Sequence, residues 1–186
     1  MRAAYALSIN PDDPLAALEV GDLAVPPIDG WVTVRVVASA LNHHDLWALR
    51  GVGLSIDRVP MVLGCDAAGI GPAGEEVIVH SVVSDMDDTR GFSLLSERYP
   101  GTHADWVAVP GENLLPKPAE LSFVEAACLP TAWLTAYRML TTVGRVKDGE
   151  SVLVQGAGGG VATAAVVLAT AMGKRVYATS RDPAKR

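Results

Sequence analysis

The fold is decided by the stretch SVLVQGAGGGVA, residues 151–162. Its first five residues form a short apolar run, which predicts a strand buried on both faces. An apolar helix pattern follows the glycines and ends near Gly173. Glycines between a strand and a helix allow a tight turn and let the backbone approach a pyrophosphate. The stretch therefore predicts a dinucleotide-binding loop with Gly156, Gly159, Gly160 and Val161 as cofactor-binding residues; a purely structural glycine turn is the alternative.

A second strand, residues 174–179, completes a βαβ unit, and its end bears on the choice of cofactor. An acidic side chain there would accept hydrogen bonds from the ribose 2′-hydroxyl of NAD. The strand instead ends in Thr179-Ser180-Arg181, and a hydroxyl followed by a guanidinium suits a 2′-phosphate. We therefore expect NADP(H) rather than NAD(H), bound by Ser180 and Arg181, with Lys185 as a further basic contact. The alternative for Arg181 is a solvated charge at a strand end.

Residues 1–120 carry short apolar runs separated by Gly, Pro and Asp turns, which predicts a mostly β segment. The strand candidates are residues 31–37, 61–63, 76–80 and 106–109. One or two helical turns are expected at 45–50. Residues 81–104 have many polar groups and little periodicity, which predicts a long surface loop.

The pattern changes near Leu121. Ser122-Phe123-Val124-Glu125 is a capping box, in which the serine accepts a backbone N–H and the glutamate reciprocates. We expect a helix from this point, a break at Pro130 and a continuation to Val143. The predicted fold class is thus mixed α/β, with a β-rich first part followed by a βαβ unit.

Composition excludes several classes of protein. The 186 residues carry a net charge of -6, and 49% are hydrophobic and 19% charged, which excludes a disordered chain. An acidic chain without a Lys/Arg cluster is not expected to bind nucleic acid or an anionic membrane. Residues 152–173 are uncharged and nearly long enough to span a bilayer, but glycines interrupt them, so no membrane segment is expected. Two cysteines without a CxxC pair, and no signal peptide, predict a cytoplasmic protein with free thiols.

Four motifs in order resemble the medium-chain dehydrogenase/reductase superfamily, and within it the quinone-oxidoreductase-like branch related to alcohol dehydrogenases. They are LNHHD at 41–45, LGCDAAG at 63–69, LPTAWLTAY at 129–137 and the glycine loop. The resemblance implies a GroES-like catalytic domain over residues 1–121, followed by a linker helix and an incomplete Rossmann domain over 122–186. It also implies hydride transfer between NAD(P)H and a small-molecule quinone, enone or carbonyl substrate.

The resemblance also raises the question of zinc. The family's catalytic zinc uses Cys, His and Cys at positions that match Asn42, Cys65 and Thr131 here, and only the second is a plausible ligand. The structural zinc of alcohol dehydrogenases needs four closely spaced cysteines near residues 81–104, where the sequence has none. We therefore expect no metal, and a zinc alcohol dehydrogenase is the weaker alternative.

By the same resemblance, Asn42 and Thr135 lie near the nicotinamide end of the cofactor. His44 is a candidate proton donor, because histidine exchanges protons near neutral pH. Asp45 completes the candidate catalytic set with Asn42 and His44, and we expect it to orient the loop. Trp47 is a candidate wall of the substrate pocket. The alternatives are a loop histidine with ordinary hydrogen bonds and a tryptophan that packs in the core.

A complete member of this family is about twice as long, and its dinucleotide binds where the strand order of a larger sheet reverses. The chain is therefore expected to be truncated, with an unpaired strand edge and uncovered apolar helix surface. A second hypothesis follows from this edge. The chain would then be a non-catalytic remnant that pairs with another copy, as a homodimer, or with another protein.

Overall fold

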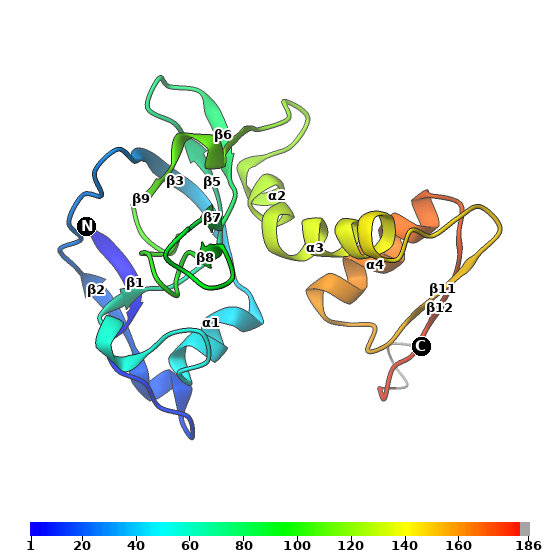
Figure 1. Ribbon diagram of the computed structural model, residues 1–186, viewed down its shortest axis with the longest axis horizontal. Coiled ribbons are helices and arrows are strands. Elements are labelled where there is room, and N and C mark those ends of the chain that lie inside the picture. Colours follow the sequence, from blue (N-terminus) through cyan, green and yellow to red (C-terminus); the bar gives the residue numbers. More distant parts are fainter. Residues whose placement is uncertain (183–186) are drawn as a thin grey trace. The chain divides into compact units, whose positions relative to one another are not determined.

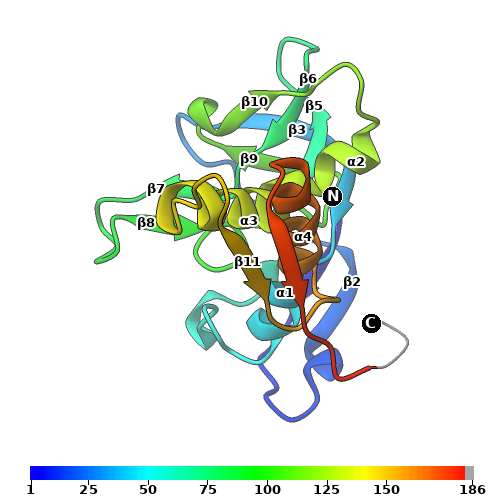
Figure 2. The same cartoon turned by 90° about the vertical axis from the view of Figure 1, so that its right-hand side faces the viewer.

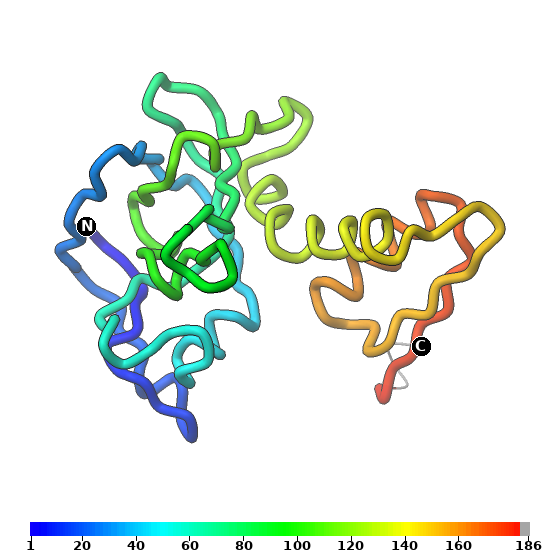
Figure 3. Tube along the Cα trace, viewed as in Figure 1, coloured from blue at the N-terminus to red at the C-terminus, as the bar shows by residue number. Residues whose placement is uncertain are grey.

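The computed structural model describes residues 1–182, and its contacts divide the chain into two compact units, Met1–Pro130 and Thr131–Arg186. Figure 3 traces the first unit from blue to yellow-green and the second from there to red. The boundary expected at residues 121 and 122 lies earlier in the chain. Helix α2 (Phe123–Ala127) packs against strands of the first unit through its buried alanines, which extends that unit to Pro130.

A five-stranded antiparallel sheet forms the centre of the first unit (Figure 1). Its strands follow the order β10-β6-β5-β3-β9. They are β3 (Val32–Ala40), β5 (Asp66–Ile70), β6 (Glu76–Val79), β9 (Trp106–Val109) and β10 (Leu114–Pro116). Alternate apolar residues such as Val34, Val77 and Val107 point into one core cluster. The strands expected at 31–37, 76–80 and 106–109 are confirmed.

A smaller sheet, with the order β2-β1-β4, supports the first helix. Its strands are β1 (Arg2–Ala6), β2 (Leu18–Asp22) and β4 (Met61–Val62). Helix α1 (His43–Leu49) contributes Ala48 and Leu49 to a core cluster that also contains residues of β1 and β4. The helical turns expected at 45–50 are therefore present, and they begin earlier, at His43.

The expectation of a long surface loop over residues 81–104 is wrong. The segment contains a hairpin of β7 (Val82–Ser84) and β8 (Phe92–Leu94). The buried carboxylate of Asp85 lies 3.1 Å from the Arg98 guanidinium and also accepts hydrogen bonds from two hydroxyls of the segment. Because these contacts are polar and not periodic, no hydrophobic pattern in the sequence predicts them.

A helical stretch follows the capping box, which forms as predicted. Ser122 accepts the N–H of Glu125, and the carboxylate of Glu125 accepts the N–H of Ser122 at 2.9 Å. Pro130 does not break the stretch but lies in a π-helical turn, Leu129–Trp133. A proline removes one N–H from the ladder, which a wider turn accommodates. Helix α3 (Leu134–Arg138) and a second π-helical turn, Met139–Val143, continue it.

The second unit contains the predicted βαβ arrangement (Figure 2). Strands β11 (Ser151–Val154) and β12 (Arg175–Ala178) are parallel, and helix α4 (Gly160–Ala171) connects them. The expected burial of β11 on both faces is wrong, since Leu153 is 62% exposed. Within residues 1–182 this sheet has two strands, β11 and β12. No helix formed by these residues has both the length and the apolar character to cross a membrane.

Candidate functional site

The glycine loop joins β11 to α4, and the end of β12 holds it in place. Gly156 and Gly158 have φ angles of 74° and 153°, which residues with a side chain rarely adopt. The N–H of Gly156 donates to Thr179 Oγ1 at 3.3 Å, and the N–H of Ala157 donates to the Thr179 carbonyl at 2.8 Å. The loop conformation is therefore tied to the end of the neighbouring strand.

Helix α4 begins directly after this loop, with Gly159 as its N-cap. A Cβ atom at Gly159 would meet no atom within 4 Å, whereas a Cβ at Gly160 would lie 3.3 Å from the Cβ of Ala132. Gly159 leaves open space beside the free N–H groups of the helix. Gly160 permits close packing of α4 on the π-helical turn that contains Ala132. Such free N–H groups, with the helix dipole, attract phosphate.

A cavity of about 590 Å³ lies between the loop and the end of β12. It is lined by Gln155, Gly156, Ala157, Gly158, Thr179, Ser180, Arg181 and Asp182. Three expected cofactor-binding residues, Gly156, Ser180 and Arg181, thus line one cavity. Asp182 lines it too and was not expected from the sequence, because it lies beyond the strand end on which the choice of cofactor was based. Lys185 lies outside the described residues.

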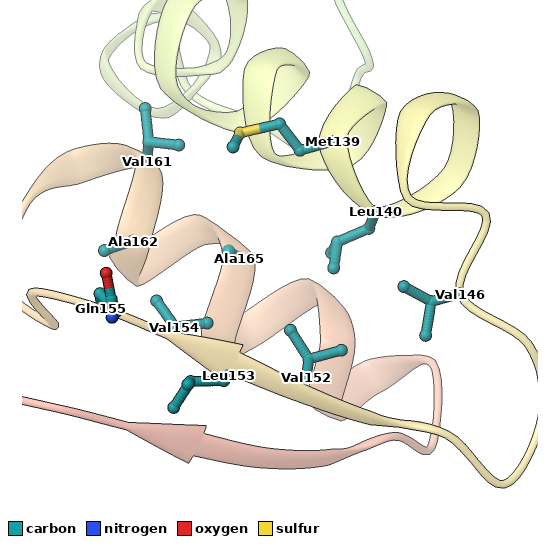
Figure 4. A pocket seen from close by; sticks show the side chains of 10 residues that line it. All are labelled: Met139, Leu140, Val146, Val152, Leu153, Val154, Gln155, Val161, Ala162 and Ala165. Carbon is teal, nitrogen blue, oxygen red and sulfur yellow. The ribbon is translucent and has the colours of Figure 1, made fainter.

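A second cavity, also of about 590 Å³, runs along β11 (Figure 4). It is lined by Met139, Leu140, Val146, Val152, Leu153, Val154, Gln155, Val161, Ala162 and Ala165. Four consecutive residues of the strand, 152–155, line the cavity. Because side chains alternate between the two faces of a strand, a cavity that touches all four lies at the edge of β11. The expected cofactor-binding residue Val161 lines this cavity and not the first. Thr135, in α3, lines neither of the two.

In the first unit, Asn42 and Asp45 shape the start of α1. The N–H of Asn42 donates to Asp45 Oδ2 at 2.7 Å, which is one half of a capping box. The Asn42 side-chain amide donates to Asp66 Oδ2 at 2.9 Å. Asp45 and Asp66 are both buried, and each of these hydrogen bonds satisfies one carboxylate oxygen, whereas Asp45 Oδ1 has no hydrogen-bond partner among the described residues. The loop-orienting role expected for Asp45 stays a prediction, and the hydrogen bond to Asn42 is the contact through which it would act.

His44 has both ring nitrogens engaged. Its Nε2 lies 3.0 Å from Glu97 Oε1, and its Nδ1 lies 3.3 Å from Cys65 Sγ. The hydrogen bond from His44 holds the pKa of Glu97 below its usual value, and Arg90 adds to this effect. Burial, together with nearby carboxylates, raises the pKa of the Cys65 thiol far above its usual value. His44 therefore donates through Nε2 to a carboxylate and faces a neutral thiol with Nδ1.

His103 contacts Asp45 and was not expected from the sequence. Its Nδ1 lies 3.0 Å from Ser39 Oγ, and its Nε2 lies 3.4 Å from Asp45 Oδ2. A Cβ at Gly64 would lie 2.7 Å from the same Nδ1, and Gly64 has a φ of 96°. The position of the His103 ring therefore requires a residue without a side chain at Gly64, in the motif LGCDAAG. No local sequence pattern connects them.

A cavity of about 490 Å³ adjoins α1 within the first unit. Its walls are mainly aliphatic, with four polar residues: Asn42, His43, Asp45 and His103. His44 and Trp47 do not line it, and Trp47 is 54% exposed elsewhere on the helix. Its volume lies in the range of small-molecule sites.

Two of the three residues that the resemblance places at the family's catalytic zinc positions, Asn42 and Thr131, are poor ligands for this metal. The amide of Asn42 donates to Asp66, and the thiol of Cys65 contacts His44. In residues 1–182 no three His, Cys, Asp or Glu side chains are arranged to hold a metal ion. Zinc would need three such ligands.

Comparisons with known proteins agree with this architecture. Residues 28–119 match the family described as the alcohol dehydrogenase GroES-like domain. The chain therefore belongs to the medium-chain dehydrogenase/reductase superfamily, a family of oxidoreductases.

Two solved structures and one curated relative show how far the similarity extends. An NAD-dependent alcohol dehydrogenase matches with a TM-score of 0.87 and 38% identity, over 100% of this chain and 59% of that one. The quinone oxidoreductase from Thermus thermophilus, solved also with NADPH, matches with a TM-score of 0.76 and 35% identity, over 100% of this chain and 55% of its own. The crotonyl-CoA carboxylase/reductase of Cereibacter sphaeroides is 31% identical over an alignment 202 residues long, gaps included. This alignment covers 94% of this chain and 47% of the relative. The chain thus spans about half the length of these relatives.

Proposed function

We propose that the chain is the N-terminal part of an NADPH-dependent oxidoreductase that transfers hydride to a quinone, enone or carbonyl substrate without catalytic zinc. The observation that carries this proposal is the cavity formed by the glycine loop, Ser180 and Arg181. The loop offers backbone N–H groups to a pyrophosphate, and Arg181 offers a guanidinium to a 2′-phosphate. When bound, the nicotinamide supplies the hydride. The two free cysteines suit a reducing compartment, so the proposal places the protein in the cytoplasm.

The choice between NADP(H) and NAD(H) depends on two neighbours. Arg181 favours a 2′-phosphate, whereas the carboxylate of Asp182 in the same cavity would accept hydrogen bonds from a 2′-hydroxyl and repel a phosphate. We assign NADP(H) because Arg181 is nearer than Asp182 to the end of β12 in the sequence. NAD(H) is the second candidate, and Asp182 is the observation that favours it.

On the substrate side, the proposal keeps Asn42, His44 and Asp45 as the catalytic set. Asn42 and Asp45 fix the start of α1 through the hydrogen bond between them. His44 is the proton donor of the proposal, and it must exchange its contact with Cys65 or Glu97 for one with substrate. Without a metal to polarise the acceptor, the reaction depends on placing the substrate against the nicotinamide and on hydrogen bonds to the developing oxyanion.

The test is a titration of the wild-type chain and of Arg181→Ala with NADPH, in which fluorescence reports binding. Loss of a charge-assisted hydrogen bond costs about 1.5–3 kcal/mol, or about a ten- to hundredfold weaker affinity. Arg175→Ala is the matched control, because this exposed arginine lies at the opposite end of β12 and does not line the cavity. Unchanged NADPH affinity in Arg181→Ala would remove the NADP assignment, and tighter NADH binding by the wild type would favour NAD.

A second candidate function is association without catalysis, either with another copy as a homodimer or with another protein. It is favoured by the open edge of β11 and by the 62% exposure of Leu153 beside it. Sedimentation of the chain over a range of concentrations distinguishes the two: association without nucleotide binding supports this candidate. Stoichiometric zinc in the purified protein would instead support a zinc alcohol dehydrogenase.

A further inference from the structure

Two side-chain clusters in the first unit have the same composition: a nucleophile, a histidine and a carboxylate. In one cluster His44 lies between Cys65 and Glu97. In the other, His103 lies between Ser39 and Asp45. A nucleophile within hydrogen-bond reach of an imidazole that a carboxylate orients is the arrangement of acyl-transfer enzymes. The two clusters differ in access to solvent.

The thiol cluster is closed. Cys65 is 3% exposed, and burial raises the pKa of its thiol far above the usual value, so the reactive thiolate is not formed. The serine cluster is open, because Ser39 is exposed on β3 while the side chains of His103 and Asp45 are each 10% exposed. The nucleophile thus meets solvent, and the base and its orienting carboxylate do not.

The serine cluster is also held firmly. Asp45 is fixed by the N–H of Asn42, which donates to its Oδ2 at 2.7 Å. His103 is fixed at both nitrogens and lies against Gly64, where no larger residue fits without displacing the ring. If the Nε2–H of His103 donates to Asp45, Nδ1 is left as the acceptor for the Ser39 hydroxyl. This tautomer gives the base its proton-accepting nitrogen on the side of the nucleophile.

We propose that Ser39, His103 and Asp45 form an acyl-transfer site that is separate from the nucleotide cavity. Ser39 Oγ attacks the carbonyl carbon of an acyl donor while its proton passes to His103 Nδ1. The bond from that carbon to the leaving group breaks, the leaving group departs as an anion, and an acyl ester forms on Ser39. His103 then releases its proton to solvent, which restores the neutral imidazole. Water then attacks the ester, giving its proton to His103, and the proton returns to Ser39 as the acid is released. Asp45 is a positioning residue that stabilises the imidazolium.

The geometry also defines the class of acyl donor. The three side chains supply a nucleophile and a base, and hydrogen-bond donors for a carbonyl oxyanion are not part of the cluster. Much of the acceleration in acyl transfer comes from such donors. The site therefore acts on donors whose leaving group departs without protonation, such as aryl esters and thioesters. Amides, which need a protonated leaving amine, are not substrates.

The experiment treats the full chain with p-nitrophenyl acetate and follows p-nitrophenolate release and the acetylated residue by peptide mass mapping. The expected result is an acetyl group on Ser39 and a release rate that falls about a hundredfold in both Ser39→Ala and His103→Gln, as loss of a nucleophile or base predicts. Ser8→Ala, at another exposed serine, is the matched control and keeps the wild-type rate.

Three results overturn the proposal. They are wild-type release in Ser39→Ala, wild-type release in His103→Gln, and acetyl groups on residues other than Ser39. The first would mean that an imidazole hydrolyses the ester directly. Ser39 is exposed, so its replacement by alanine leaves the core intact. NADPH binding, measured on the same samples, reports on the second unit and does not depend on the outcome.

Discussion

Replacement of Gly64 by alanine tests whether the packing around His103 is as tight as the structure shows. Gly64 has a φ of 96°, where a Cβ costs about 1–2 kcal/mol. The new Cβ would also lie 2.6 Å from Thr102 Oγ1 and 2.7 Å from His103 Nδ1. Neither neighbour moves freely, because Thr102 is fully buried and donates to the Asp66 carbonyl at 2.9 Å, and His103 is held at both nitrogens.

Making room for this Cβ breaks at least one of those hydrogen bonds, which adds about 1–2 kcal/mol. We therefore expect Gly64→Ala to lower the free energy of unfolding by about 2–4 kcal/mol. The assay is urea unfolding followed by tryptophan fluorescence. Gly74→Ala is the matched control, since Gly74 has a φ of 88° and a Cβ there would meet no atom within 4 Å. Equal losses of stability in the two variants would refute the close contact between Gly64 and His103.

Three further predictions concern the same unit. A thiol reagent added to the folded chain should label Cys128 at once and Cys65 only after unfolding, because Cys65 is buried and its pKa is raised; equal labelling rates would contradict this. The lowered pKa of Glu97 stabilises the fold above the ordinary pKa of a glutamate, and this contribution is lost as pH falls through the lowered value. His44→Gln should therefore weaken the acid dependence of stability in a pH series of urea midpoints, and an unchanged slope would argue against the pair. Thr102→Val removes a hydroxyl that donates to a buried carbonyl, and calorimetry should show a loss of about 1–3 kcal/mol; no loss would mean that water replaces it.

Much of the fold could be predicted because its signals are local. The run before Gly156 and the pattern after it encode a strand, a turn and a helix within a few residues, and Ser122 with Glu125 encodes a helix start. Residues 81–104 were predicted wrongly for the opposite reason. Their order comes in part from polar contacts of Asp85 with Arg98 and Tyr99 further along the same segment, and such contacts have no period in the sequence.

The candidate site was predictable to a similar extent. Gly156, Ser180 and Arg181 lie close together because the ends of parallel strands in a βαβ unit meet at one edge. His103 could not be found, since its partners Ser39 and Asp45 are far from it in the chain. The contacts of both ring nitrogens of His44 could not be predicted either, because Cys65 and Glu97 are also far from it in the chain.

The most direct test of the central claim is calorimetric titration of the wild-type chain with NADPH and, separately, with NADH. The account predicts one bound nucleotide per chain, with NADPH bound more tightly, because the proposal assigns the 2′-phosphate to Arg181. Chemical-shift changes on NADPH binding should fall on Gly156–Gly160 and Ser180–Arg181. Absence of binding by either nucleotide, or shifts confined to other residues, would contradict the account.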